Sequence, residues 1–351
     1  MSSRSLLTAL SALIAISAGW GVFWMIMQGV DLAFHQDGSG QTAAVTQASD
    51  QAAEPVLSVT VAPPAADPNS LTILMGGDIM FDRGVRQLGQ AYGYDSLFAN
   101  ITPLFKTADI VVANLEGPVT SNQSKTLLPN GTYGSQLTFT FATTTPAALV
   151  KAGVNLVSLA NNHTDNFGQS GYKETQHWLD AAGLAWFGDP WNSTSTERIV
   201  CQKGMCIAFV GYHAFIPGFD RIVKEVKRLS DLGDFVIVMP HWGVEYSPHS
   251  TADQEAKARA LVAAGADAII GSHPHVVEDH EWIGSVPVYY SLGNLLFDQY
   301  FSTSTMSGEL VEMRLNKTGA GIHLDRLRTY EVSTASKKGI TASLEPSDGS
   351  R

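Results

Sequence analysis

Short apolar segments alternate with amphipathic ones between Leu71 and about Tyr330. Each apolar segment is rich in Val, Ile and Leu, which is typical of strands buried on both faces of a sheet. The pattern therefore predicts strands at LTILMGG (71–77), DIVVANL (109–115), NLVSLA (155–160), LAWFG (184–188), CIAFVGY (206–212), DFVIVMP (234–240), DAIIGS (267–272) and VPVYYSL (286–292).

Start and stop signals predict helices between several of these strands. Pro146 opens a segment that ends at Gly153, the residue type that most often follows a helix. Thr251 begins another, with Gln254 at the capping-box position. Two more helices are expected at 170–182 and 220–232. This alternation predicts an α/β fold in which right-handed crossovers place helices outside largely parallel sheets.

A different pattern marks the N-terminus, where Leu6 to Val30 is nearly all apolar. A helix of that length would span roughly 37 Å, enough to cross the hydrocarbon core of a bilayer. Arg4 precedes the segment and acidic residues follow it, so the positive-inside rule predicts a cytoplasmic tip and an extracytoplasmic remainder. The alternative is a cleaved signal peptide, but its apolar region is usually only about 7–15 residues long. The length favours an uncleaved anchor.

Polar, weakly patterned segments flank the α/β region. Residues 36–70 are rich in Gln, Thr, Ala, Ser and Pro, and such a composition cannot bury enough surface to fold. Residues from about Ser333 have a similar character. We therefore expect a cytoplasmic tip and transmembrane anchor (1–35), a disordered linker (36–70), one α/β domain (71–332) and a flexible tail (333–351).

The amino-acid composition limits the classes of molecule that this protein could bind. A hydrophobic content of 44% with 9% aromatic residues describes a folded protein and excludes general disorder. The net charge is -11 and there is no cluster of Lys and Arg, which argues against nucleic acid as the main partner. An acidic surface would also repel a polyanion at long range, so an anionic ligand must be captured locally by a metal or a placed arginine.

The only cysteines are Cys201 and Cys206, in the segment CQKGMC. Two cysteines are too few for a disulfide-built scaffold, and a zinc clasp would need further ligands nearby. Lys203 and Gly204 are typical of a tight hairpin turn. A disulfide across this hairpin is expected if the domain lies outside the cytoplasm; two free thiols are the alternative.

Metal-binding residue types follow five of the predicted strands, and the carboxyl ends of parallel strands meet at one edge of a sheet. Each residue alone has an ordinary structural explanation, such as a helix cap or a surface histidine. Five strand ends together indicate a metal or catalytic site. The residues concerned are Asp78, Asn114 with Glu116, Asn162 with His163, His241, and His273 with His275.

Six motifs, in this order, resemble the capsule-biosynthesis CapA family of poly-γ-glutamate synthesis proteins: GGDIMFDRGV, VANLEGPVT, LANNHTDNFG, PHWGVEY, GADAIIGSHPHV and YSLGNLLFDQ. The resemblance covers about residues 71–330. This family is similar to the calcineurin-like metallophosphoesterases, which implies a four-layer α/β sandwich that usually holds two metal ions.

The resemblance implies a set of metal ligands and one catalytic residue. The implied ligands are Asp78, Glu116, Asn162, His241, His273 and His275, and His163 would face the substrate as a general acid. Imidazole, carboxylate and amide donors suit Mn, Zn or Fe better than Ca. Met80 stands where the superfamily has a histidine, and Glu116 stands where it has a bridging aspartate. The resemblance therefore implies one or two ions.

Other polar residues near these motifs are candidates for substrate binding. Arg83 could bind a carboxylate or phosphate with its fork of donors, although a solvated helix residue is the alternative. Asn114 and Glu245 lie close to presumed ligands in sequence, and Asn294 ends the last predicted core strand at the same sheet edge. His213 ends another predicted strand. The other histidines, His177, His249, His280 and His323, are expected at the surface.

Two functions remain open. The first is a metal-dependent hydrolase or transferase that acts on an anionic extracellular polymer or its precursor. The second is a non-catalytic factor that binds such a polymer and supports its export, together with other capsule-synthesis membrane proteins. Loss of the histidine at Met80 favours the second, whereas Asn162-His163 and the His273–His275 pair favour the first.

Overall fold

The computed structural model describes residues 69–344, except 128–129, 135, 194–195 and 337–338. The predicted anchor, Leu6 to Val30, and nearly all of the predicted linker lie outside these residues. Within the described part of the chain, none of the helices combines the length and apolar character needed to cross a bilayer.

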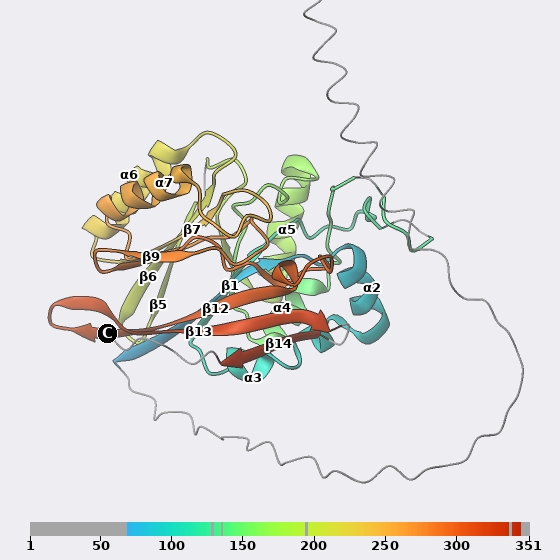
Figure 1. Ribbon diagram of the computed structural model, residues 1–351, viewed down its shortest axis with the longest axis horizontal. Coiled ribbons are helices and arrows are strands. Elements are labelled where there is room, and N and C mark those ends of the chain that lie inside the picture. The colour runs from blue at the N-terminus through green and yellow to red at the C-terminus, as the bar shows by residue number, and fades with distance from the viewer. Residues whose placement is uncertain (1–68, 128–129, 135, 194–195, 337–338, 345–351) are drawn as a thin grey trace, which may run out of the picture. The chain divides into compact units, whose positions relative to one another are not determined.

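One layer of the fold is an eight-stranded mixed sheet, in the order β14-β13-β12-β1-β2-β3-β4, with β11 pairing with β1 (Figure 1). Strands β1 to β4 and β11 are parallel, whereas β12, β13 and β14 are antiparallel. The strands are β1 (Ser70–Ile79), β2 (Ile110–Leu115), β3 (Leu156–Ser158), β4 (Ala185–Phe187), β11 (Asn294–Leu296), β12 (Ser307–Thr318), β13 (Gly321–Ser336) and β14 (Gly339–Leu344).

The second sheet has six strands, in the order β5-β6-β7-β8-β10-β9. Its four central strands are parallel, and the antiparallel strands β5 and β9 form the two edges. The strands are β5 (Glu197–Gln202), β6 (Met205–His213), β7 (Phe235–His241), β8 (Ala268–Ile270), β9 (His280–Ile283) and β10 (Val286–Tyr289).

The two sheets pack face to face, and helices cover both outer faces (Figure 1). Along β1 the side chains alternate: Ile73 and Met75 pack against the six-stranded sheet, whereas Leu74 packs towards the helices. One group of helices is α2 (Arg83–Tyr92), α3 (Thr102–Phe105), α4 (Thr145–Ala152) and α5 (Gly168–Ala182), and the other is α6 (Phe219–Asp231) and α7 (Ala252–Ala263). Two 3-10 helices, η1 (Tyr94–Phe98) and η2 (Ser304–Met306), lie in loops.

The predicted α/β fold, with helices outside the sheets, is confirmed. Each of the eight predicted strand segments contains a strand, and all four predicted helices form. Thr251 and Gln254 make the expected capping box of α7, and Gly153 ends α4 in the left-handed conformation. The structure adds α2 and α3, which the sequence patterns did not predict.

The C-terminal part of the chain corrects the sequence-based prediction. Strands β12 and β13 mix charged and apolar positions because their sheet is only partly covered, so the search for continuous apolar runs missed them. The domain boundary predicted at 332 lies inside β13, and β14 pairs with β13 from Tyr330↔Leu344 to Ser336↔Gly339. The prediction of a flexible tail is therefore wrong for the described strand residues after 332, where backbone pairing orders a polar sequence.

Candidate metal centre

The predicted ligands come together where parallel strands of both sheets end. Asp78 lies in β1, and Glu116 follows β2 directly. Asn162 follows β3, and His241 is the last residue of β7. His273 and His275 lie in the loop after β8. Two groups of possible ligand atoms, each within 4.8 Å of one another, are formed by Glu116, His241 and His273, and by Asp78, Glu116 and His275.

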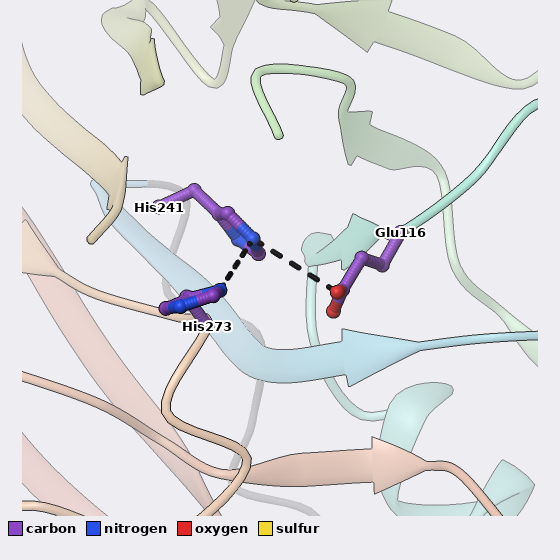
Figure 2. Close-up of side chains that lie close together, drawn as sticks. All are labelled: Glu116, His241 and His273. Atoms are coloured by element: carbon purple, nitrogen blue, oxygen red, sulfur yellow. Dashed lines mark hydrogen bonds and ion pairs between the residues drawn. The ribbon is translucent and has the colours of Figure 1, made fainter. Parts of the chain in front are cut away.

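In the first group, the side chains of Glu116, His241 and His273 point toward one another (Figure 2). Nε2 of His241 lies 3.2 Å from Nδ1 of His273 and 3.9 Å from Oε1 of Glu116. The amide oxygen of Asn162 lies 2.9 Å from the same Nε2. On its other side, Nδ1 of His241 lies 3.0 Å from the hydroxyl of Ser272. The amide nitrogen of Asn114 lies 3.3 Å from the same Nδ1. Metal binding at Nε2 would require the ring proton on Nδ1, where the Ser272 hydroxyl can accept it.

The second group shares Glu116 with the first. Nε2 of His275 lies 3.7 Å from Oε1 of Glu116, and Nδ1 of His275 lies 3.2 Å from Oδ2 of Asp78. The same Asp78 oxygen accepts a hydrogen bond from the backbone N–H of His273 at 3.1 Å. One carboxylate common to two ligand groups is the arrangement expected for a residue that bridges two ions.

Glu116 provides the test of whether a cation fits. Its side chain is fully buried, and among the described residues neither carboxylate oxygen has a hydrogen-bond partner. Burial raises its pKa well above the usual value, and the nearby carboxylates of Asp78 and Glu245 raise it further. Buried carboxylate oxygens are rarely left unpaired, because the loss of hydration is costly. A divalent cation would satisfy both oxygens, so the residues present fit a metal ion.

The buried histidines are neutral for the same physical reason. Burial lowers the pKa of His241 well below its usual value, and it lowers the pKa of His273 to about 3. Neighbouring histidines add to the effect. Neutral imidazole is the form that coordinates metal, so no proton would have to be displaced from these rings on binding.

Backbone strain is concentrated in the loop after β8. His273 has a φ of 102° and His275 a φ of 59°, a region that residues with a side chain rarely adopt. Such conformations cost about 1–3 kcal/mol each and persist only where neighbouring groups fix them. Here Asp78 accepts from the N–H of His273, and the Asn294 amide donates to the carbonyl of His275 at 3.2 Å. The strain places both imidazoles at the centre.

His163 lies at the edge of the centre, as its position after Asn162 predicts. Its Nε2 is 3.9 Å from Oε1 of Glu116, and its Nδ1 is 3.2 Å from the amide oxygen of Asn166. Its ring packs on Phe139 with centroids 4.4 Å apart. Burial lowers its pKa to about 4. The ring is therefore neutral at neutral pH, with a proton on Nδ1 towards Asn166 and an acceptor at Nε2.

Two residues expected to bind substrate are instead buried behind the ligands. The Asn114 amide donates to Oδ1 of Asp78 at 2.8 Å and accepts from Asn161 at 3.0 Å. The Asn294 amide oxygen lies 3.2 Å from Nδ1 of His275, and its nitrogen donates to backbone and side-chain oxygens. Both side chains are fully buried, so the structure does not support direct contact with a substrate. Their hydrogen bonds position the ligands Asp78 and His275.

The remaining two candidates lie nearer the surface. The guanidinium of Arg83 is paired with Asp298 and lies 5.2 Å from the ring centre of Phe139 and 5.5 Å from that of Phe297. Its side chain is 17% exposed, so it is not the solvated helix residue considered above. Its Nε has no hydrogen-bond partner among the described residues, and its role in binding an anion stays a prediction. Glu245 is exposed in the loop after β7.

Met80 does not point to the ligands. It is completely buried in the hydrophobic core on the side of α2 to α5, and its sulfur accepts a hydrogen bond from the N–H of Asp82. Where a ligand histidine was expected by resemblance, this chain has a core residue.

Sequence patterns missed several residues that support the centre. Ser272 orients His241, and Asn166 orients His163. Both are common residue types whose partners are far away or in a loop, so nothing in the local sequence marks them. His213, by contrast, was already singled out as the end of a predicted strand. It ends β6, its ring centroid lies 6.5 Å from that of His241, and its Nδ1 lies 2.8 Å from the carbonyl oxygen of Pro190.

The amino-acid sequence is similar to those of known proteins. A family model described as bacterial capsule synthesis protein PGA_cap matches residues 72–299. The chain is 33% identical over 296 residues to the capsule biosynthesis protein CapA of Bacillus anthracis, covering 78% of this chain and 71% of that protein. It is 32% identical over 272 residues to the PGA biosynthesis protein CapA of Bacillus subtilis (strain 168), covering 70% and 68%.

A solved structure, the calcineurin-like phosphoesterase YfkN from Bacillus subtilis, aligns with 77% of this chain and 92% of its own. The TM-score is 0.42 and the sequence identity 13%, a similarity too low to carry an argument.

Proposed function

Because the chain belongs to the PGA_cap family of bacterial capsule synthesis proteins, we propose that it is a metal-dependent hydrolase or transferase of poly-γ-glutamate or capsule biosynthesis. Its substrate would be an anionic extracellular polymer or its precursor. The observation that carries the proposal is Glu116, whose two buried oxygens have no hydrogen-bond partner among the described residues and face two groups of ligands.

The centre would hold one or two divalent ions, of Mn, Zn or Fe. His241, His273 and Asn162 would bind one ion, Asp78 and His275 the other, and Glu116 would contact both. When bound, such an ion polarises a carbonyl or phosphoryl group and lowers the pKa of a coordinated water. Imidazole and carboxylate donors suit these metals. The two face-to-face sheets with outer helices support the finer proposal of a metallophosphoesterase-like four-layer sandwich.

This chain's own residues would then orient substrate and hold a proton. Asn166 keeps the proton of His163 on Nδ1, which leaves Nε2 to accept a proton or a hydrogen bond at the edge of the centre. His163 can act as the expected general acid only after Nε2 has taken up a proton. Arg83 would contribute positive charge beside the site while Asp298 and two aromatic rings fix its position.

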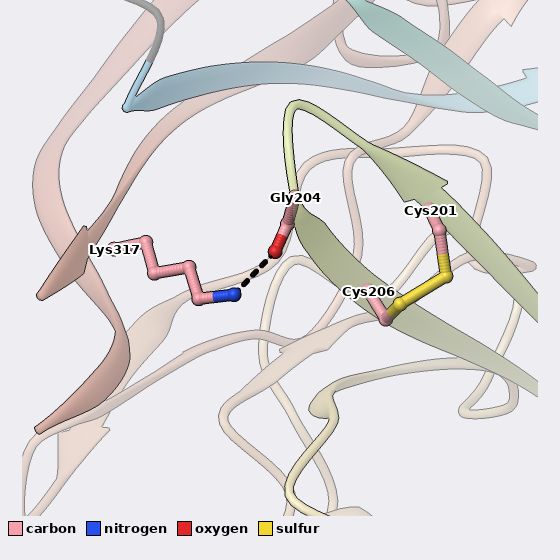
Figure 3. The surroundings of a disulfide bond; sticks show 4 residues. All are labelled: Cys201, Gly204, Cys206 and Lys317. Atoms are coloured by element: carbon pink, nitrogen blue, oxygen red, sulfur yellow. Dashed lines mark hydrogen bonds between the residues drawn. A yellow bond between two sulfur atoms is a disulfide. The ribbon is translucent and has the colours of Figure 1, made fainter. Parts of the chain in front are cut away.

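We also propose that the domain is extracytoplasmic and held by the N-terminal segment as a single-pass anchor. The disulfide between Cys201 and Cys206 supports an oxidising location, since such bonds are rare in the cytoplasm (Figure 3). It closes the β5–β6 hairpin, in which Lys203 and Gly204 have φ values of 49° and 70°. A reporter enzyme that works only outside the cytoplasm should be active when it is fused after Ser70. A reporter that works only in the cytoplasm should be inactive at the same position.

A second function has its own support. Met80 is a core residue and offers no ligand to the centre, and His163 is neutral, so the site is less suited to proton donation than the resemblance implies. A metal-loaded centre could bind polymer carboxylates without turnover. The alternative is therefore a non-catalytic factor for binding and export of the polymer, working beside other capsule-synthesis membrane proteins.

Metal analysis of the purified full-length chain tests the proposal. The wild-type protein should contain close to one or two equivalents of Mn, Zn or Fe by mass spectrometry, and Glu116→Gln should lose most of it. Glu312→Gln is the matched control, since Glu312 is a buried glutamate in β12 that bonds Tyr330. A screen against phosphoesters and γ-glutamyl peptides then separates the two functions. Equal metal content in both variants would refute the metal centre.

A further inference from the structure

His213 is a buried histidine to which the metal centre described above gives no role. It ends β6, and strand pairing places it beside His241, the last residue of β7. Residues paired across neighbouring strands project their side chains from the same face of a sheet, so both imidazoles extend to the same side. His213 is only 5% exposed, and it adds an imidazole next to the first ligand group (Glu116, His241 and His273).

The hydrogen bonds of His213 fix which ring nitrogen carries the proton. Its Nδ1 lies 2.8 Å from the carbonyl oxygen of Pro190. A carbonyl oxygen can only accept a hydrogen bond, so the proton is on Nδ1 and Nε2 holds a lone pair. The Asn192 amide holds the backbone in place, because it donates to the carbonyl of His213 at 2.7 Å and accepts from its N–H at 3.0 Å. Burial lowers the pKa of His213, which favours the neutral ring.

The lone pair on Nε2 of His213 is buried and has no hydrogen-bond partner among the described residues. A buried acceptor without a donor costs about 1–3 kcal/mol. A phenylalanine would fill the same space without that cost. The unpaired Nε2 therefore indicates that a molecule outside this chain supplies the donor.

His213 is set back from the position of an ion. It belongs to neither of the two ligand groups. The ring centroids of His241 and His273, which belong to one group, lie 4.8 Å apart, whereas those of His213 and His241 lie 6.5 Å apart. Two imidazole nitrogens that share an ion lie about 3–3.5 Å apart, because each bond to the metal is about 2.0–2.1 Å long. The position of His213 is therefore suited to contact a molecule bound beside the ion.

Phe215 packs its ring on all three of these imidazoles. Its centroid lies 4.4 Å from that of His273, 5.7 Å from that of His213 and 6.2 Å from that of His241. The side chain is nevertheless 48% exposed, in the loop between β6 and α6. Because half of this side chain already faces water, its displacement by a bound molecule costs little burial. Displacement of Phe215 would open a route to Nε2 of His213.

We propose that His213 is a recognition residue of the metal centre, whose Nε2 accepts a hydrogen bond from an O–H or N–H group of the molecule bound at the first ligand group. This inference rests on the proposed metal centre and adds a requirement on its substrate, namely a hydrogen-bond donor next to the oxygen that faces the ion. A protonated phosphate or an amide has such a donor, whereas a fully ionised oxyanion has none. The fixed tautomer makes the requirement one-sided, because Nε2 cannot donate.

Phosphate and sulfate are matched probes for an O–H donor. At mildly alkaline pH both are tetrahedral dianions of similar size, and only phosphate carries a proton. Titration calorimetry on the metal-loaded full-length chain in detergent gives the ratio of the two Kd values. His213→Phe keeps a ring and loses the acceptor, so it should lower the preference for phosphate about 3- to 10-fold. His280→Phe, at an exposed histidine on β9, is the matched control and should leave the ratio unchanged.

Acetohydroxamate and its N-methyl derivative test an N–H donor in the same way, because both present the same two oxygens to a metal. A preference for the N–H compound that falls in His213→Phe supports an N–H donor. A preference that persists in this variant reflects steric exclusion of the methyl group and overturns the N–H donor. His213→Gln, whose amide oxygen can lie near the position of Nε2, should keep part of each preference that His213→Phe loses.

A fall in either ratio supports the recognition role and identifies the type of donor. The role is overturned if both ratios in His213→Phe equal those in His280→Phe, or if the metal-loaded wild-type chain binds none of the four probes. Loss of metal from His213→Phe would also overturn it, since His213 would then be a ligand. These results leave the metal centre itself intact. Absence of metal from the reconstituted wild-type chain would instead refute the proposed function, and this inference with it.

Discussion

The metal centre and the β5–β6 hairpin lie at opposite ends of the paired sheets, and they differ in how their polar groups are satisfied. At the hairpin end, Lys203 donates to the carbonyl of Ser70 at 3.1 Å and pairs with Asp109 at 2.7 Å. Lys317 donates to the carbonyl of Gly204 (Figure 3). At the other end, Glu116 is fully buried without a partner among the described residues, and two histidines have strained backbones.

This difference in how polar groups are satisfied separates a structural end of the sheets from a ligand-binding end. The hairpin end joins the amino ends of β1 and β2 to the second sheet through partly exposed contacts, which water can replace at little cost. The site end keeps buried charge and strain that water cannot relieve. Selection for stability alone would remove such features, and their presence supports the metal centre proposed above.

The largest expected effect is catalytic and lies at the site end. His163→Ala should lower the turnover number about 10²- to 10⁴-fold, since a positioned proton-transfer group contributes that much. It should keep its metal, because His163 lies outside both ligand groups. His241→Ala should lose metal and activity together. Parallel metal analysis and kinetics distinguish the two roles, and an empty site in His163→Ala would make that residue a ligand.

The acid sensitivity of the metal-free protein should also come from the site end. The pKa of His163 is lowered to about 4 in the folded state, against about 6.5 when unfolded. Between these values the unfolded chain binds the extra proton, so stability is lost as the pH falls from about 6.5 to 4. For His163 alone this amounts to roughly 3 kcal/mol.

Urea unfolding of chelator-treated wild type and His163→Gln at pH 4 to 7 measures this contribution. Glu116, whose pKa is raised, acts in the opposite direction in both proteins, so the difference between them isolates His163. Equal pH dependence in the two proteins would contradict the prediction.

At the hairpin end, removal of the disulfide should have a moderate effect. Replacing both Cys201 and Cys206 with Ser should lower the free energy of unfolding by about 2 kcal/mol, the loop-closure value for so short a loop. Metal content should not change, because the site lies at the other end of the strands. Thermal unfolding with and without a reductant gives the same comparison in the wild-type protein. A loss of metal on reduction would show that the two ends are coupled.

The smallest effect is expected from the ion pair at the hairpin. Lys203→Ala should change stability by less than about 1 kcal/mol, since Lys203 and Asp109 are both partly exposed. High salt should remove most of that difference. A loss several times larger, measured by urea unfolding, would mean that this end is held as tightly as the core.

Much of the fold could be predicted from sequence because its signals are local. Apolar runs marked the eight strands, and Thr251 with Gln254 marked the start of α7. The resemblance to the CapA family, read from six motifs, is confirmed by the family match over residues 72–299. The antiparallel strands β12 and β13 escaped because half-exposed strands lack the continuous apolar run of a buried one.

The candidate site also contains residues that the sequence could identify and residues whose role only the structure reveals. Residue type and position after a strand were enough to select Asp78, Glu116 and the histidines, because the carboxyl ends of parallel strands must meet. Residue type could not say that Asn114 and Asn294 are buried behind the ligands, or that Arg83 is paired with Asp298. Their partners lie far away in sequence, at separations of 36, 19 and 215 residues for Asn114–Asp78, Asn294–His275 and Arg83–Asp298.

The sequence by itself determined which elements form and which chemical groups are available, since hydrophobic periodicity, caps and turns act over a few residues. Only the tertiary structure decided the state of those groups. The raised pKa of Glu116, the neutral histidines and the exposed rings of Phe215 and Tyr246 depend on burial and on neighbours brought from distant loops. Burial removes water, and without water the energy of a polar group is set by whatever the fold places beside it.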